Sequence, residues 1–335
     1  MTNDIDVDSL FDSVGQPWLD DPNRDLCAAA QAGNADEVAE LIAKGADPNC
    51  KNEDGDRPLH IAAFWGWEDV ARVLLAHKAD IGAEGEYGMH PLHSAVLGGN
   101  PDMTAFLLDA GASLTAADQD GKQPIHTAAL NHDREERVFV ERHSNNGLIA
   151  SISFPPPADI ETTLDILLAR GASVDARDNG GKTPLYTAAS EGHLRVARKL
   201  LAAGADAKAT DSGKLTPLHG ASQWNHAALV ELLLEAGADI NSQEEHGGTP
   251  LHRAAFLNAT EAAELLLEWG ADPHLCNDLG KTPFQESRSV AMCDLIRKGM
   301  DDPDFFRRRR LERLAAEHQR RMRKLLGNRK PVPAI

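Results

Sequence analysis

A proline followed by an apolar residue recurs at a fixed interval along most of the chain. Successive prolines of this pattern are 33 residues apart except for one gap of 60, so one copy carries 27 additional residues. A period of about 20 to 50 residues indicates units that cannot bury their apolar faces alone and therefore stack on one another. The chain is thus predicted to be a repeat array; its marker prolines are Pro58, Pro91, Pro124, Pro184, Pro217, Pro250 and Pro283.

Each copy has the pattern of two short helices and a turn. A segment such as TPLHGAS or TPLHRAA is followed by VELLLEAGAD or AELLLEWGAD, whose Gly lies about twenty residues after the Pro. Proline presets the backbone at a first helical position, a preceding Thr caps the helix, and the later Gly suits a left-handed residue beyond the second helix. Three units lack this Thr and have Arg57, His90 or Gln123 instead, and Lys78 replaces one such Gly.

The period, the TPLH core and the GAD terminator together resemble the ankyrin repeat over residues 23–300. The resemblance implies an all-α ankyrin-repeat solenoid of about eight stacked helix-turn-helix units with hairpin-like turns. We expect the degenerate first unit (DLCAAAQAGNADEVAELIAKGAD) and the divergent last unit (TPFQESRSVAMCDLIRKGM) to act as caps. Histidines at one position per unit (His60, His93, His126, His219 and His252) are expected to form hydrogen bonds within and between repeats, as similar ankyrin histidines do.

The additional residues, 133–159, fall between the two helices of the fourth unit. Val138–Arg142 and Leu148–Phe154 are rich in residues that favour strands, and Asn146-Gly147 between them is a strong hairpin signal. We therefore expect a protruding hairpin or ordered loop that makes a second contact with a partner. The alternative is an insertion that the repeat tolerates and does not use.

The two ends differ from the repeats in charge. Residues 1–22 contain six Asp and no basic residue, which indicates either a segment that covers the first repeat or a short acidic-hydrophobic motif. Residues 301–335 form a basic tail, with eleven Lys or Arg and two Glu after Phe306, whereas the rest of the chain carries 23 basic and 50 acidic groups. The tail is predicted to be a helix with an apolar stripe of Leu311, Leu314, Ala315, His318, Met322, Leu325 and Leu326.

The basic amphipathic tail leaves several interpretations open. Such helices contact anionic membranes, nucleic acids or acidic protein grooves. The tail can equally be a solvated helix, or it can fold back onto the acidic repeats and be covered by them.

The chain shows no signature of catalysis, a cofactor or a metal site. Gly181-Lys182-Thr183 and Gly280-Lys281-Thr282 resemble the end of a phosphate-binding loop, but Ala176 and Leu275 stand where that loop needs its first Gly. One histidine per stacked unit cannot build a tetrahedral metal site. The four widely spaced cysteines indicate a reducing compartment, and no apolar run is long enough to span a bilayer, so we expect a cytoplasmic, monomeric protein.

The predicted function is non-enzymatic binding of another protein, as an adaptor, scaffold or inhibitor. The resemblance implies that the partner docks on the concave groove, which is formed by the turn tips and the exposed positions of each first helix. Acidic tips would favour a basic segment on the partner, and aromatic residues are frequent anchors in interfaces. Among the candidates we expect Trp65, Tyr87 and Trp224 to be exposed, although Phe64 and Phe256 could instead pack on the next unit. The candidate residues are Asp54, Asp56, Phe64, Trp65, Tyr87, Met89, Leu97, Leu130, Leu215, Trp224, Phe256 and Leu257.

Overall fold

The computed structural model describes residues 21–130 and 159–326, which are helical and contain no strand. The predictions for the acidic leader and for the inserted hairpin concern residues 1–20 and 131–158 and lie outside the described residues. The all-α prediction is confirmed. The first helices of the repeats are α2 (Pro22–Ala32), α4 (Pro58–Trp65), α6 (Pro91–Gly98), α8 (Pro124–Leu130), α10 (Pro184–Glu191), α12 (Pro217–Gln223), α14 (Pro250–Leu257) and α16 (Pro283–Glu286).

Each first helix is followed in the sequence by a second helix. A short 3-10 helix, η1 (Glu86–Gly88), lies in one of the long turns, and α18 (Pro303–Leu326) follows the last repeat. The second helices are α3 (Ala35–Ala43), α5 (Glu68–Ala76), α7 (Pro101–Asp109), α9 (Ile160–Ala169), α11 (Leu194–Ala202), α13 (Ala227–Glu235), α15 (Thr260–Glu268) and α17 (Val290–Asp301).

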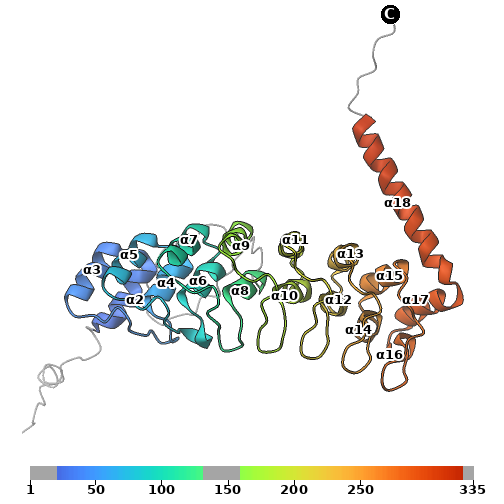
Figure 1. Cartoon of the computed structure of the whole chain (residues 1–335), viewed down its shortest axis with the longest axis horizontal. Helices are drawn as coiled ribbons and strands as arrows, with labels where there is room; N and C mark the ends of the chain where they lie inside the picture. The colour runs from blue at the N-terminus through green and yellow to red at the C-terminus, as the bar shows by residue number, and fades with distance from the viewer. Residues whose placement is uncertain (1–20, 131–158, 327–335) are drawn as a thin grey trace, which may run out of the picture. The chain divides into compact units, whose positions relative to one another are not determined.

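The chain divides into two compact units. Unit 1 comprises residues 1–119 and 133–170, and unit 2 comprises residues 120–132 and 171–335. Within unit 1, α4 packs between α2 and α6, while α3 packs on α5 and α7 packs on α9 (Figure 1). Within unit 2, the first helices α8 to α16 pack in sequence, and the second helices α11 to α17 form a parallel row.

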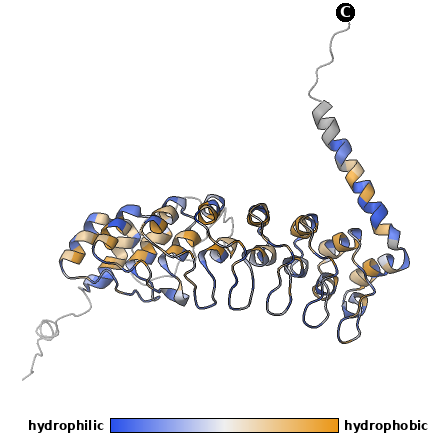
Figure 2. Ribbon diagram, in the orientation of Figure 1, coloured by the Kyte–Doolittle hydropathy of each residue, from blue (hydrophilic) through white to orange (hydrophobic). Residues whose placement is uncertain are grey.

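Small and branched apolar residues let the helices approach closely. In unit 1, Leu59, Ala62 and Ala63 of α4 are buried, as is Leu92 of α6. A Cβ at Gly98 would lie 2.2 Å from the carbonyl oxygen of Phe64, so the contact between α4 and α6 requires glycine there. Figure 2 shows hydrophobic stretches on the repeat helices and mainly hydrophilic long turns. Stability therefore comes from one helix packing on the next, as expected of stacked repeats.

The capping chemistry at the helix ends differs between repeats. The Thr183 hydroxyl accepts a hydrogen bond from the N–H of Tyr186 at 3.2 Å, whereas Arg57 makes no capping bond with its side chain. His90 makes the other bond of a capping box, in which its backbone N–H donates to Nδ1 of His93 at 3.1 Å. Lys78 adopts the left-handed conformation (φ 67°) that Gly takes in other units, which is unfavourable by about 1–2 kcal/mol for a side chain with a Cβ.

Candidate functional site

The tips of the long turns are joined to one another within each unit. In unit 1, the N–H of Gln119 donates to the carbonyl of Tyr87 at 3.0 Å. In unit 2, the N–H of Asn179 donates to Asp120 at 2.8 Å, and the same step recurs from Ser212 to Gly180 at 2.9 Å. The Asp120–Asn179 bond and the packing of α8 on α10 keep neighbouring repeats stacked across the position of the insertion. The turn tips are therefore ordered, and the exposed side chains on them have fixed positions.

One turn tip of unit 1 carries a strongly exposed aromatic residue. Tyr87 is 65% exposed and lies at φ 53°, a left-handed conformation that is uncommon for an aromatic residue. Next to it, Met89 is half-buried, and its carbonyl accepts a hydrogen bond from His60 at 2.9 Å. The expected exposure of Tyr87 is confirmed.

The two acidic candidates of unit 1 have different surroundings. Asp54 is exposed at its tip. Asp56 is half-buried, and its carboxylate accepts a hydrogen bond from the N–H of Glu86 at 3.0 Å, which joins two neighbouring tips. Asp56 therefore links two neighbouring turn tips. Asp54 is the carboxylate of this pair that faces solvent.

The ends of the first helices in unit 1 carry partly covered side chains. Phe64 and Trp65 form an edge-to-face pair with ring centroids 5.8 Å apart, and both are half-buried, as is Leu97. The amide of Asn100 donates to the carbonyl of Phe64 at 2.7 Å and fixes the end of α4. The exposure expected for Trp65 is thus only partial.

The corresponding helix ends in unit 2 are more open. Trp224 is 58% exposed, Phe256 is 49% exposed and Leu257 is 45% exposed. The guanidinium of Arg288 lies 5.4 Å from the centre of the Phe256 ring. The expectation that Trp224 is exposed is confirmed, and the alternative in which Phe256 is buried is wrong. Two further candidates, Leu130 and Leu215, are half-buried.

The backbone around Trp224 is held by the next repeat. Asn225 is left-handed (φ 60°), and its side-chain oxygen accepts a hydrogen bond from the N–H of Ala262 at 3.0 Å. The Asn225 amide also contacts the carboxylate of Glu261. His226 forms a hydrogen bond with the carbonyl of Ser190 at 3.0 Å. The exposed indole therefore projects from a turn that is fixed on both sides.

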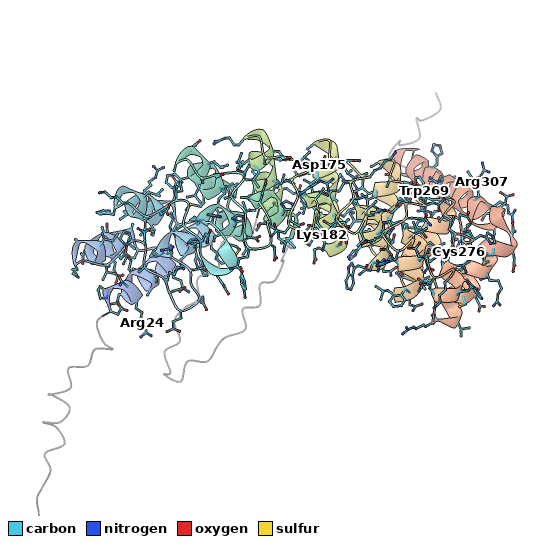
Figure 3. The ribbon with its side chains drawn as sticks, turned by 60° about the horizontal axis from the view of Figure 1, so that its bottom comes forward. Arg24, Asp175, Lys182, Trp269, Cys276 and Arg307 are labelled. Carbon is cyan, nitrogen blue, oxygen red and sulfur yellow. The ribbon has the colours of Figure 1, made fainter. Side chains whose placement is uncertain are left out.

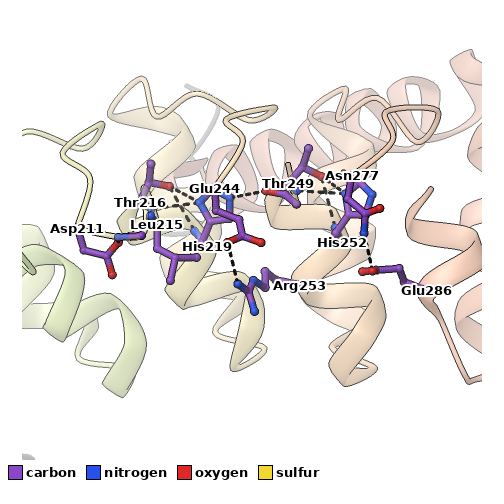
Figure 4. Close-up of polar contacts among 12 residues, drawn as sticks. Asp211, Leu215, Thr216, His219, Glu244, Thr249, His252, Arg253, Asn277 and Glu286 are labelled. Atoms are coloured by element: carbon purple, nitrogen blue, oxygen red, sulfur yellow. Dashed lines mark hydrogen bonds and ion pairs between the residues drawn. The ribbon is translucent and has the colours of Figure 1, made fainter. Parts of the chain in front are cut away.

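The repeated histidines have the structural role that the resemblance implies. The N–H of Thr216 donates to Nδ1 of His219 at 3.1 Å, so Nδ1 carries no hydrogen and Nε2–H donates to the carbonyl of Gly248 at 3.2 Å (Figure 4). His252 repeats this pattern with Thr249 and Lys281. Burial lowers the pKa of His219 to about 4 and also lowers the pKa of His252. Both are neutral near pH 7, and no cluster of potential metal ligands occurs among the described residues.

The start of α18 docks on the second helices of unit 2. Phe306 is only 1% exposed, and Arg310 stacks on the ring of Trp269 at 3.4 Å. Arg309 pairs with Glu264, while Arg313 pairs with Glu231 at 3.0 Å and with Glu268 at 3.2 Å. Figure 3 shows Trp269 and Arg307 close to the junction between the last repeats and α18. The first turns of the tail thus fold onto acidic repeat helices.

The docked face of α18 is not its apolar stripe. The docked residues Phe306, Arg309, Arg310 and Arg313 follow the spacing i, i+3, i+4, i+7 and share one face. Leu311, Leu314, Ala315 and His318 follow the same spacing five positions later, about 140° around the helix. Leu311 is 61% exposed, Leu314 is 43% exposed, and Ala315 and His318 are exposed. The sequence predicted the apolar stripe and gave a tail folded onto the acidic repeats as one alternative, but it did not identify the docked residues.

The sequence that forms these paired helices matches a family model described as ankyrin repeats (3 copies), over residues 26–118, 158–244 and 213–277. The chain belongs to the ankyrin-repeat family. Ankyrin repeats are protein–protein interaction modules. No curated protein sequence matches the chain.

Two solved ankyrin domains are similar to this chain. The ankyrin repeat domain of Bcl-3, a unique member of the IkappaB protein family, is 29% identical with a TM-score of 0.55; the match covers 73% of this chain and 100% of that one. The human ASB11 ankyrin repeat domain is 23% identical with a TM-score of 0.58, covering 72% and 96%, and supports the fold alone. No helix among the described ankyrin repeats, or in the described part of α18, is long and apolar enough to cross a membrane.

Proposed function

We propose that this ankyrin-repeat protein is a non-enzymatic adaptor, scaffold or inhibitor that binds a partner protein. Each of the two units carries its own set of contact residues. On unit 1 the contact residues are Tyr87, Met89 and Asp54, with the edges of Phe64, Trp65 and Leu97. On unit 2 they are Trp224, Phe256 and Leu257, and the half-buried Leu130 and Leu215 are further candidates. The exposure of Tyr87 and Trp224 on fixed turns is the observation that supports this proposal best.

Exposed aromatic side chains in fixed positions suit binding. Only 5% of the residues of this chain are aromatic, yet two of the largest exposed apolar side chains are Tyr87 and Trp224. Tyr and Trp are enriched among the residues that dominate interface energies. Because the turns are already ordered by hydrogen bonds to the next repeat, little further conformational entropy is lost when a partner binds. An unfavourable left-handed conformation at Tyr87 also fits a functional position.

The charge of unit 1 suggests the chemistry of its partner. Glu53 and Asp54 are both exposed at the same tip. Exposed carboxylates attract a basic segment mainly by accelerating the encounter, and salt screens this effect. We therefore propose that the segment bound by unit 1 is basic, with the aromatic residues providing most of the affinity.

Replacing Tyr87 and Trp224 by alanine tests this assignment. Partners captured by the wild-type protein would first be identified and purified, and their dissociation constants then measured for each variant. Loss of a central aromatic residue is expected to weaken binding by tenfold or more, about 1.4 kcal/mol at least. Val290→Ala is the matched control, because Val290 is 79% exposed but lies outside both surfaces. Unchanged constants for the double variant would refute the proposed surfaces.

A second candidate function rests on the free face of α18. Leu311 and Leu314 are exposed on a basic helix whose opposite face is already paired with the repeats. In this alternative the protein is a regulator, and the helix binds an acidic protein, a membrane or nucleic acid. Among the described side chains of α18, Arg309 and Arg313 are the ones that pair with acidic residues of the repeats.

A chain that ends at Ala316 separates the two candidates, because it keeps Phe306 and Arg313 in place and removes the distal basic residues. Binding through the repeats is expected to persist in this chain within about twofold, whereas binding through α18 is expected to weaken, because Leu311 and Leu314 remain but the basic residues beyond them are removed. Leu311→Asp/Leu314→Asp in the full chain is the matched variant, since it alters the free face and leaves the docked face intact. If both variants bind like the wild type, α18 has no part in partner binding.

A further inference from the structure

Two cysteines that are distant in the sequence meet in the first repeat of unit 1. Sγ of Cys27, on α2, lies 3.8 Å from Sγ of Cys50, which is 23 positions later in the long turn that leads to α4. Both side chains are buried, at 7% and 9% exposure. The remaining cysteines have other surroundings: Cys276 is exposed and Cys293 is partly buried. The sequence pattern alone did not indicate this pair.

The turn that contains Cys50 is held against α2 by Asn23. The side-chain oxygen of Asn23 accepts a hydrogen bond from the N–H of Asp47 at 2.8 Å, and its carbonyl oxygen accepts one from the Cys50 thiol at 3.5 Å. The N–H of Cys50 in turn donates to the carbonyl of Asp47 at 2.9 Å. These bonds place the thiols next to each other in the reduced protein. A disulfide, at about 2.05 Å, then requires the two sulfur atoms to approach by less than about 2 Å.

We propose that Cys27 and Cys50 are a reversible oxidation site, at which a peroxide converts the two thiols into a disulfide. The sulfur of one cysteine attacks a peroxide oxygen, giving a sulfenic acid and one molecule of water or alcohol. The second thiol attacks the sulfenic sulfur, the S–S bond forms, and water leaves with the remaining oxygen. In total the two thiols lose two protons and two electrons, which reduce the peroxide to water, or to water and an alcohol. A dithiol reductant reverses the step by thiol–disulfide exchange.

The chemistry of the pair favours Cys50 as the first nucleophile. The hydrogen bond from the Cys27 thiol lowers the pKa of Cys50, whereas the same contact and burial raise the pKa of Cys27. Cys27 is then positioned to resolve the sulfenic acid. Access to the buried pair is provided by local opening, since α2 and α3 belong to a terminal repeat whose helix contacts run to α4 and α5.

The disulfide would fasten the first repeat to the turn that begins the second. It closes a loop that contains all of α3 and so restricts the opened state of this repeat. Amide exchange in α2 and α3 is therefore expected to slow by roughly tenfold to a hundredfold on oxidation. The exposed residues of α4 and η1 would keep their positions while the repeat beside them became less mobile.

The test uses the full chain with Cys276→Ser and Cys293→Ser, which leaves only the buried pair. After exposure to hydrogen peroxide, the intact mass is expected to fall by about 2 Da, for two hydrogens, and a non-reduced digest to contain one peptide that joins Cys27 to Cys50. Dithiothreitol should restore the mass. The exchange rates of α2 and α3 would be measured before and after oxidation.

The same chain with Cys50→Ser in addition is the matched control, and it is expected to gain oxygen or form dimers through Cys27 rather than lose two hydrogens. Circular dichroism of each variant verifies that the repeats remain folded. The proposal is overturned if Cys27 and Cys50 both stay open to alkylation after peroxide treatment and denaturation. It is equally overturned if Cys50 accumulates as sulfinic acid without the linked peptide.

Discussion

Replacing Phe306 by alanine is expected to lower the free energy of unfolding by about 3 to 5 kcal/mol, the usual range for a fully buried phenylalanine. Phe306 is 1% exposed and lies against Gly299 of α17, close enough that a Cβ on Gly299 would come within 3.4 Å of the ring. Its removal leaves a cavity between α18 and α17 that these helices cannot easily close. The ring therefore acts as the anchor by which α18 covers the last repeat.

The loss is expected to be local, because each repeat contacts only its neighbours. Urea unfolding gives the change in free energy, and amide exchange should show α15, α17 and the start of α18 opening first. Leu311→Ala is the matched control on the same helix, since Leu311 is 61% exposed, and its effect should stay within about 0.5 kcal/mol. If Phe306→Ala is no more harmful than Leu311→Ala, α18 is not a structural cap.

The sequence predicts the helix of the tail but not the docking of Phe306. The spacing of Leu311, Leu314 and His318 predicts an amphipathic helix, and the helix is present. Periodicity gives the apolar face but not the partner of that face. Here Arg309 and Arg313 face the repeats because Glu264, Glu231 and Glu268 offer carboxylates on α13 and α15. Those contacts join residues more than forty positions apart, which no local pattern encodes.

The repeats themselves were far more predictable. A proline at a fixed period sets the start of each first helix, and Thr183 or Thr216 before it caps that helix as expected. The left-handed conformation of Lys78 also follows from its place in the period. Each of these features depends on residues near one another in the sequence, so one unit predicts the next.

The candidate site was predictable by position but less so by exposure. Trp224 and Tyr87 are open, whereas Trp65 is partly covered by its contact with Phe64. Asp56 belongs to a bridge between tips that depends on the exact register of two turns. The Cys27–Cys50 contact similarly depends on how Asn23 holds a turn against α2. Period identifies equivalent positions, and packing decides which of them reach solvent.

The second prediction concerns acid: His219→Gln is expected to reduce the loss of stability between pH 6.5 and pH 4. In the folded protein Nδ1 of His219 accepts a hydrogen bond from the N–H of Thr216. Protonation of Nδ1 would break this bond and bring two N–H groups face to face. Burial lowers the pKa of His219 to about 4, compared with about 6.5 in the unfolded chain. The unfolded state thus binds a proton at a higher pH than the folded state does.

The direction of the effect follows from this difference in proton binding. Above pH 6.5 neither state binds the proton, and the wild-type protein has its full stability. As the pH falls from 6.5 towards 4, only the unfolded state is protonated, so unfolding becomes more favourable, by roughly 2 to 3 kcal/mol for this histidine. His60 and His252, whose pKa values burial also lowers, add losses in the same direction.

Glutamine is the appropriate replacement because Gln285 already occupies the equivalent position in the last repeat, where its side-chain oxygen accepts from the N–H of Thr282 at 2.9 Å. His219→Gln keeps that bond, removes the titrating group and weakens the bond to Gly248. We therefore expect a variant about 1 kcal/mol less stable at pH 7 but with a flatter decline towards pH 4. Urea unfolding at several pH values measures this slope, with the exposed His246→Gln as the control. Parallel slopes for the wild type and His219→Gln would contradict a buried, neutral histidine at this position.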